Sequence, residues 1–364
     1  MAAPPELEIA VLPGDGIGPE VVAEGVKVLR AVEEGGSAAF YFTELPWGTE
    51  WYLEHGEMMP ADGLGRLAGF DAIYLGAIGS PLVPDHLTLR DLVLRIRFGF
   101  HQFVNLRPVR LLRGAVSPLA GSPKVDMVFV RENSEGEYAG VGDRLFAGTE
   151  REVALQTAVF SRQGVERVIR WAFEYARGTG RSRVASISKG NVLNYSAVLW
   201  DEVFDEVRED YPELESESLL VDAAGLYMVT QPERFDVVVA SNLFADILSE
   251  IGAGIQGGVG LAASANLDPE RRFPSMFEPI HGSAPDIAGR QLANPVGAIW
   301  SASLLLEHFG LPDQGAAVLE AVQDVLEEGR RVTPDLGGKA TTAEMGDAVA
   351  ARLRGSPHPP HVSA

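Results

Sequence analysis

Short apolar strands alternate with amphipathic helical segments along most of this 364-residue chain, and this alternation constrains the fold more than any other feature. Strands are predicted at 7–12, 70–76, 124–130, 184–187 and 235–240, each a short, mainly apolar run. Strands that are apolar on both faces need helices above and below them. We therefore predict an α/β fold with a largely buried, mostly parallel sheet.

Segment 137–161 follows a different pattern. It consists of two alternating stretches joined through Gly148, which predicts an antiparallel ribbon rather than a buried strand and helix.

Composition narrows the classes of function. The length suits two domains or one large one. With 51 acidic against 30 basic residues, the net charge of −21 argues against a nucleic-acid or membrane-surface partner. The chain has no cysteine, which excludes disulfides and thiolate metal sites and suits a reducing cytoplasm. The first residues lack a signal-peptide pattern, and no apolar stretch reaches the ~18 residues of a membrane span. We expect a soluble cytoplasmic protein.

The glycines at 14, 16 and 18 follow the first predicted strand. Their spacing is G-x-G-x-G, one residue short of the G-x-G-x-x-G dinucleotide pattern. We predict a turn that lines an active-site cleft; a standard dinucleotide turn is the alternative.

Segment 86–113 holds six arginines and one acid, a local charge of +5 in an acidic chain. Such a concentration of charge attracts a small anion. Arg97, Arg107 and Arg131 come from separate elements, and their guanidinium groups suit a dicarboxylate. The alternative is surface ion pairing, which we expect for Arg110 and Arg113.

Asp246 and Glu250 are spaced i, i+4 and so lie on one face of a predicted helix. Two such carboxylates repel unless both are solvated or a metal ion joins them. Asp222, after an apolar run, is a third candidate. Oxygen ligands select Mg²⁺ or Mn²⁺. A solvated helix surface is the alternative.

Lys189 stands at a strand end, and Tyr138 lies in Glu135-Gly136-Glu137-Tyr138. Partial burial near a metal lowers the pKa of a lysine toward the range of a general base, and a tyrosine beside arginines could donate a proton. A surface cation and a packing residue are the alternatives.

Taken in order, these segments closely resemble the β-decarboxylating dehydrogenase family, which includes isocitrate, 3-isopropylmalate, homoisocitrate and tartrate/D-malate dehydrogenases. The resemblance runs from about residue 7 to 352 and is carried by LPGDGIGPE (12–20), NLRPVR (105–110), VRENSEGEY (130–138), SKGNVL (188–193), VDAAGLYMV (221–229), SNLFADILSE (241–250) and EPIHGSAPDIAG (278–289).

This resemblance implies an isopropylmalate-dehydrogenase-like fold, with two α/β domains, a cleft between them and a dimer-forming antiparallel ribbon. Residues 1–102 and 257–364 would form the larger, cofactor-binding domain, and residues 103–256 the central substrate and dimerisation domain. The cleft would close on the substrate.

The resemblance also implies chemistry. Arg97, Arg107 and Arg131 would hold the carboxylates of a 2-hydroxy dicarboxylate. Lys189 would accept the hydroxyl proton as hydride leaves C2, and after CO₂ loss Tyr138 would protonate the enol.

A metal ion, Mg²⁺ or Mn²⁺, would be held by Asp222, Asp246 and Glu250, with Asp222 also close to the substrate. K⁺ is left open as a further cofactor. Lys189 and Asp222 would enter the active site of a neighbouring subunit, so the active protein would be a homodimer.

NAD is the cofactor that the resemblance implies. A 2′-phosphate would meet the like charge of Asp286, which favours NAD over NADP. The matching cofactor positions are Gly76, Ala77, Asn191, His281, Gly282, Ser283, Ala284, Pro285, Asp286, Ile287, Asn294 and Asp335.

Within the family, the chain looks most like the tartrate/D-malate branch, which oxidises and decarboxylates D-malate and handles tartrates. The matching segments are Trp47 with 50–56, 58–60, 76–81, 83–86 and 102–105. A 3-isopropylmalate or other 3-substituted malate dehydrogenase is the alternative. From another class, a non-catalytic regulatory subunit stays open.

Two departures affect this comparison. Arg90-Asp91-Leu92 stands where the branch usually has Trp-Gly-Ser, beside the variable substituent of the malate core. Val93 and Leu94 would suit an alkyl group, whereas Arg90 would suit a further carboxylate, so the substituent stays open.

The second departure is Glu250, which stands where the family normally has Asp. It would bind the metal directly or through water.

Overall fold

The computed structural model describes residues 4–121 and 123–355. Within them the chain forms two compact units. Unit 1 comprises 4–100, Leu112–Val116 and 257–355, and unit 2 comprises His101–Leu111 and Ser117–Gln256 apart from residue 122. The assignment of 1–102 with 257–364 to cofactor and of 103–256 to substrate and dimerisation stays a prediction.

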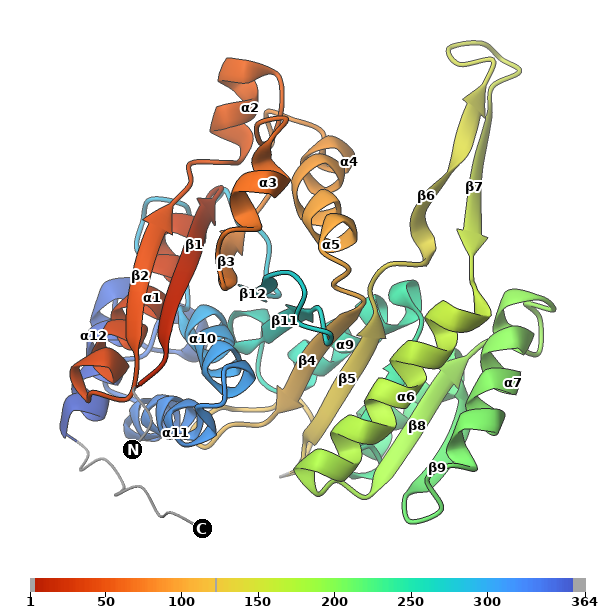
Figure 1. The fold of residues 1–364 in the computed structure, drawn as a ribbon. Helices are drawn as coiled ribbons and strands as arrows, with labels where there is room; N and C mark the ends of the chain where they lie inside the picture. The colour runs from red at the N-terminus through yellow and green to blue at the C-terminus, as the bar shows by residue number, and fades with distance from the viewer. Residues whose placement is uncertain (1–3, 122, 356–364) are drawn as a thin grey trace. The chain divides into compact units, whose positions relative to one another are not determined.

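Unit 1 contains a mainly parallel set of strands (Figure 1). Strand β1 pairs in parallel with β2 and β3, and β12 pairs in parallel with β3. Only the β11–β12 pair is antiparallel among the pairings recorded for the described strands of this unit. The order is β2 (Ala39–Glu44), β1 (Glu6–Gly14), β3 (Ala72–Ala77), β12 (Ser275–Pro279) and β11 (Ala263–Leu267).

Long helices cover these strands. In helix α1, Val21, Val22 and Leu29 recur at helical spacing and are buried, and the helix contacts β1 and β3. Helix α10 is buried from Val296 to Leu306, so it forms the centre of its helical layer. The long helices of unit 1 are α1 (Gly18–Glu34), α10 (Val296–His308), α11 (Pro312–Glu328) and α12 (Thr342–Gly355).

Segment 85–99 is helical throughout, but its middle is a π turn. Helix α4 (Asp85–Thr88) runs into the π turn Leu89–Leu94 and then into α5 (Arg95–Gly99). Leu92, Val93 and Ile96 join the core on this side of unit 1. Shorter elements of the unit are α2 (Thr49–His55), α3 (Gly63–Leu67) and the 3₁₀ turns Val259–Leu261 and Pro334–Leu336.

Unit 2 also has a mainly parallel set of strands. Pairs β5–β10, β10–β8 and β8–β9 are parallel, and β4 runs antiparallel to β5. The order is β4 (Val104–Arg110), β5 (Asp126–Glu132), β10 (Val237–Ala240), β8 (Arg183–Ser188) and β9 (Glu215–Leu220). Each of the five predicted strands overlaps an observed one, and the predicted α/β class is confirmed.

Helices pack on both faces of the unit 2 strands. In Figure 1, α6 and α7 lie in front of the strands and α9 lies behind them. The core between β5 and α9 includes Phe129, Ala245 and Leu248. The helices are α6 (Arg162–Thr179), α7 (Ser196–Arg208), α8 (Val221–Thr230) and α9 (Asn242–Ile255), with a 3₁₀ turn at Pro232–Arg234.

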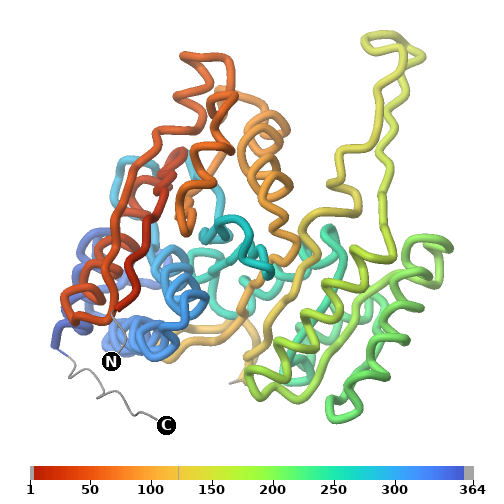
Figure 2. Tube along the Cα trace, in the orientation of Figure 1, coloured from red at the N-terminus to blue at the C-terminus, as the bar shows by residue number. Residues whose placement is uncertain are grey.

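The predicted antiparallel ribbon is present as a hairpin that projects from the rest of unit 2 (Figures 1 and 2). It consists of β6 (Gly136–Leu145) and β7 (Val153–Val159), and Gly148 lies in the connection at φ +75°. Several of its large apolar side chains are exposed, namely Val141, Leu145, Phe146, Val153, Leu155 and Val159.

None of the described helices combines the length and the apolar character that crossing a membrane requires.

Candidate functional site

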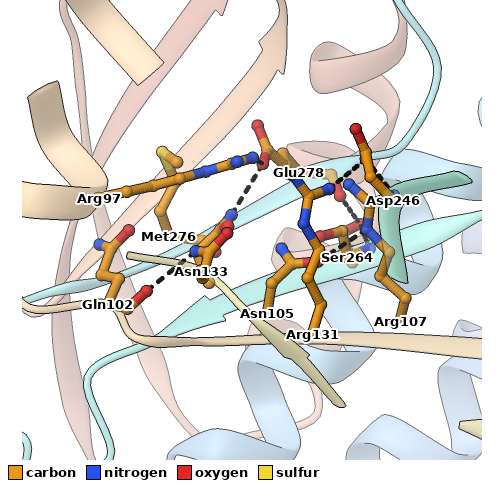
Figure 3. A network of polar contacts seen from close by, with 12 residues as sticks. Arg97, Gln102, Asn105, Arg107, Arg131, Asn133, Asp246, Ser264, Met276 and Glu278 are labelled. Atoms are coloured by element: carbon orange, nitrogen blue, oxygen red, sulfur yellow. Dashed lines mark hydrogen bonds and ion pairs between the residues drawn. The ribbon is translucent and has the colours of Figure 1, made fainter. Parts of the chain in front are cut away.

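Two buried arginines of unit 2 converge on one carboxylate (Figure 3). Arg107 on β4 and Arg131 on β5 are 6% and 2% exposed. Arg107 Nη1 lies 3.1 Å from Asp246 Oδ1, and Arg131 Nη1 donates a hydrogen bond to the same oxygen. Because β4 and β5 are neighbours and α9 packs against both, the fold brings these three predicted site residues together.

Neighbouring polar side chains fix the two guanidinium groups. Arg107 Nε donates to Asn105 Oδ1 at 2.7 Å, and its Nη1 donates to Ser249 Oγ at 2.8 Å. Arg131 Nε donates to Asn242 Oδ1 at 2.9 Å. Buried guanidinium groups held in this way are oriented before a ligand arrives.

Tyr138, on β6, joins the same cluster. Its hydroxyl donates to Asp246 Oδ2 at 3.0 Å, and the Arg131 guanidinium lies 5.7 Å from its ring centre. Burial raises the pKa of Tyr138, and the negative charge of Asp246 adds to the shift. The phenol therefore keeps its proton throughout the neutral range.

Glu250 lies one turn after Asp246 on α9. Its side chain is exposed, yet partial burial of the carboxyl group raises its pKa. Asp246 acts in the same direction, while Arg107 and Arg131 oppose the shift.

Lys189 and Asp222 form a second cluster in unit 2. Lys189 follows strand β8, and its Nζ lies 2.5 Å from Asp222 Oδ1 in the first turn of α8. The hydrogen bond from Lys189 holds the pKa of Asp222 below its usual value. Among the residues that the structure describes, no three acidic or histidine side chains could hold one metal ion. The described chain therefore does not bring Asp222 together with Asp246 and Glu250.

Arg97 belongs to unit 1, where it is buried in an ion pair. Its Nη2 donates to Glu278 Oε1 at 2.7 Å, and Asn266 Nδ2 donates to the same oxygen at 2.8 Å. Sequence reasoning missed these two partners, although Glu278 begins the segment 278–289 that the family resemblance singled out.

Two of the predicted cofactor residues of unit 1, Ala77 and Ser283, contact the glycine turn. Ile17 N donates to Ser283 O at 2.8 Å, and Asp15 N donates to Ala77 O at 2.6 Å. A methyl group at Gly16 would overlap the Ser283 carbonyl, closer than the 3.0 Å that real Cβ atoms keep. The turn thus packs directly against segments 76–77 and 281–286.

A buried polar atom also marks this region. His281 Nδ1 lies 3.0 Å from Gly282 O, while its Nε2 is buried and has no hydrogen-bond partner within residues 4–121 and 123–355. Burial lowers the pKa of His281, so the ring is neutral near pH 7. Asn294 Nδ2 donates to Asp335 Oδ2 at 2.9 Å. The close backbone approach and the unpartnered ring nitrogen fit a bound nucleotide.

The remaining predicted residues are dispersed. Asn191 is exposed in unit 2, and Asp286 is exposed in unit 1. Arg90 is exposed and forms a two-point ion pair with Asp91, at 2.7 and 3.1 Å. Val93 is buried in the unit 1 core.

Leu94 is partly buried, whereas Leu89, which sequence reasoning did not select, is 44% exposed.

The sequence matches proteins of known kind along nearly its whole length. It is 49% identical over 351 residues to a probable tartrate dehydrogenase/decarboxylase of Bacillus subtilis, covering 96% of this chain and 98% of that protein. It is 47% identical over 352 residues to the D-malate dehydrogenase [decarboxylating] of Escherichia coli, covering 94% and 97%. A 3-isopropylmalate dehydrogenase of Thermobifida fusca is 49% identical over 349 residues, covering 95% and 98%.

The fold agrees with these matches. The crystal structure of isocitrate dehydrogenase from Methylococcus capsulatus superposes with a TM-score of 0.87 at 36% identity, covering 96% of this chain and 99% of that one. The model of the isocitrate/isopropylmalate dehydrogenase family matches residues 8–349. The chain therefore belongs to the isocitrate/isopropylmalate dehydrogenase family, as an oxidative decarboxylating dehydrogenase of a hydroxy acid with tartrate and D-malate dehydrogenases among its relatives.

Proposed function

We propose that the protein oxidises and β-decarboxylates a 2-hydroxy dicarboxylate of the malate type, with D-malate and tartrate as the leading substrates. The observation that carries this proposal is the convergence of Arg107, Arg131 and Tyr138 on the Asp246 carboxylate. Two fixed guanidinium groups and a phenol form a site for a small anion rich in oxygen. The names of the Bacillus subtilis and Escherichia coli relatives point to the same substrates.

The arginines would hold the substrate by its carboxylates. Arg107 and Arg131 are buried, so their charge is weakly screened and attracts an anion strongly. Asp246 offsets part of this charge and orients both side chains. Arg97 is proposed as the third carboxylate ligand, supported by its buried, fixed position against Glu278.

Two residues would move protons. Lys189 would take the hydroxyl proton while hydride leaves the same carbon, and Asp222 would hold the amine in place. After CO₂ is lost, Tyr138 would give its proton to the enol carbon. The raised pKa of Tyr138 keeps that proton available.

A divalent ion, Mg²⁺ or Mn²⁺, would be held by Asp246, Glu250 and Asp222, all oxygen donors of the kind that these ions prefer. Since one copy does not bring Asp222 to the other two, we propose that a second copy supplies Asp222 together with Lys189. When bound, the ion supplies Lewis-acid polarisation of the substrate oxygens. Whether K⁺ also takes part is a question for the assay.

A homodimer is supported by the hairpin of β6 and β7. An isolated two-stranded hairpin is marginally stable in water, and this one exposes Val141, Leu155 and Phe146. Packing against a second copy would bury them. A cytoplasmic location and the absence of nucleic-acid and membrane partners stay predictions from composition.

NAD is proposed as the hydride acceptor, bound in unit 1 around the glycine turn, His281 and Asn294. The exposed Asp286 carboxylate would repel a 2′-phosphate, which supports NAD over NADP.

The structure offers two cues to the substituent of the malate core, and they point to different substrates. Because Asp91 pairs with Arg90, the extra cation is offset, which supports a substrate without a third carboxylate. The exposed Leu89 favours the alternative, a 3-isopropylmalate or similar alkylmalate.

NADH formation with Mn²⁺ and K⁺ would be followed across D-malate, L-malate, the tartrate isomers, 3-isopropylmalate and isocitrate. NADP, EDTA and K⁺-free reactions serve as controls. We expect the highest kcat/KM with D-malate or a tartrate. With EDTA present, we expect no NADH formation. A higher kcat/KM with 3-isopropylmalate would select the alternative substrate.

The non-catalytic regulatory subunit has its own test. Wild-type protein that binds these acids without turnover would support that function. Turnover by the wild type, with Lys189→Met inactive but still binding, would exclude it.

A further inference from the structure

The lysine loop, residues 188–193, carries Lys189 from the end of strand β8. Ser188 is buried, and the backbone N–H groups of Val192 and Leu193 donate to Lys189 O at 3.1 and 3.0 Å. These bonds close a turn, but they do not by themselves fix the turn on the rest of unit 2.

Asp201 on helix α7 is an unusual neighbour of this loop. Other acids of α7 are exposed and pair with arginines, as Glu206 does with Arg162 and Asp205 with Arg208. Asp201 instead is only partly exposed, and its Oδ1 is buried without a hydrogen-bond partner in the described part of the chain. An unsatisfied buried oxygen is costly, so it calls for a compensating role.

The other oxygen of Asp201 packs directly against the loop. A methyl group at Gly190 would overlap Asp201 Oδ2, while its next neighbours would be Asp201 Cγ at 3.3 Å and Ala197 O at 3.8 Å. A side chain at residue 190 would therefore require the Asp201 carboxylate to move. Gly190 N also donates a long hydrogen bond, 3.3 Å, to Ser188 Oγ. Asp201 thus packs against Gly190, the residue after Lys189, and Gly190 is in turn bonded to Ser188, the residue before it.

We infer that Asp201 is a positioning residue: it braces the loop at Gly190 and so holds Lys189 where the amine can accept the substrate proton. The inference rests on the proposed function, because it takes Lys189 as the base. Removing the Asp201 carboxylate would let the Lys189 amine shift from its position. A misplacement of about 1 Å can cost about 100-fold in rate.

The test combines Asp201→Ala, Gly190→Ala and the double variant, with Asp205→Asn as the matched control one turn along α7. We expect Asp201→Ala to lower kcat about 10- to 100-fold without a comparable change in KM. Gly190→Ala should also lower kcat, because its methyl group pushes against Asp201. The double variant should be no worse than Asp201→Ala, since the clash is gone. Asp205→Asn should match the wild type.

A readout independent of turnover follows the reactivity of Lys189. The chain has only four lysines, so acetic anhydride labelling can be read residue by residue by mass spectrometry, with the exposed Lys339 as internal reference. Both single variants should change the Lys189 to Lys339 labelling ratio several-fold, and Asp205→Asn should not. The free energy of unfolding is also measured for the two single variants and the double variant, so that additivity can be tested on stability as well.

The outcomes distinguish a failure of the proposed function from a failure of the inference about Asp201. A wild type inactive on every substrate would refute the proposed function, and the labelling and unfolding cycles would still decide whether Asp201 braces the loop. Additive effects of Gly190→Ala and Asp201→Ala would overturn the inference. So would a kcat and a Lys189 labelling ratio that Asp201→Ala leaves unchanged.

Discussion

Replacing Tyr138 by Phe removes one hydroxyl group and tests the proposed proton donor directly. The lost hydrogen bond to Asp246, 3.0 Å long and partly buried, should cost only about 0.5–1.5 kcal/mol of folding stability. A positioned general acid contributes about 10²- to 10⁴-fold in rate. That range is about 3–5 kcal/mol of transition-state stabilisation, at 1.36 kcal/mol per tenfold. We therefore expect a large fall in kcat from a protein of nearly normal stability.

The order of steps sharpens this prediction. The phenol acts after hydride transfer, and Arg107 and Arg131 remain to hold the substrate. Tyr138→Phe should thus leave KM close to that of the wild type and should still form NADH rapidly on the first turnover. Stopped-flow absorbance would measure this burst, and steady-state rates would measure kcat. The exposed Tyr41 on β2 provides the matched control, Tyr41→Phe, which should behave as the wild type. A kcat within threefold of the wild type, or the loss of the first-turnover NADH, would refute the assigned role.

Further predictions concern binding, specificity and assembly. Arg131→Lys loses the bond to Asn242 and should raise KM for D-malate roughly 10- to 100-fold, at about 1.5–3 kcal/mol for a charged hydrogen bond; an unchanged KM would contradict carboxylate binding by this group. Asp91→Ala frees Arg90 from a surface pair worth about 0–1 kcal/mol, so relative kcat/KM should shift toward isocitrate by up to about fivefold; a shift the other way would count against the proposed charge offset. Leu155→Glu on the hairpin should produce an inactive monomer, measured by light scattering; an active monomer would exclude shared active sites.

The repeating pattern of strand and helix made the fold class predictable. Residues 70–76 and 235–240 are apolar enough to require burial on both faces, and both became strands of parallel pairs. The glycine-linked alternation around Gly148 likewise predicted the hairpin. Strand β9, Glu215–Leu220, was missed because four of the six residues in its sequence ESESLL are polar, and it is held by its pairing with β8 rather than by burial.

The types of residue in the candidate site could be predicted from the sequence, but which of these residues lie together could not. The residue types of Arg107, Arg131 and Asp246 indicated anion and metal chemistry, and the fold brought these three together. Sequence could not show that Glu278 neutralises Arg97, because 181 positions separate them and only the packing of unit 1 joins them. Nor could it show that Val93 faces the core, since that depends on the helical geometry of segment 85–99.

That geometry has a consequence for how specificity can change. The π turn Leu89–Leu94 lies in a continuous helical stretch between α4 and α5, and such a turn holds one residue more than an α-helix would. Deleting one residue from a regular α-helix would rotate its two ends by about 100° relative to each other, since an α-helix has about 3.6 residues per turn. Deleting one residue from the π turn would instead restore a continuous α-helix and leave Asp85–Thr88 and Arg95–Gly99 nearly in their present orientation. A length change of one codon would therefore redirect side chains within Leu89–Leu94 while the helical turns on either side keep their faces.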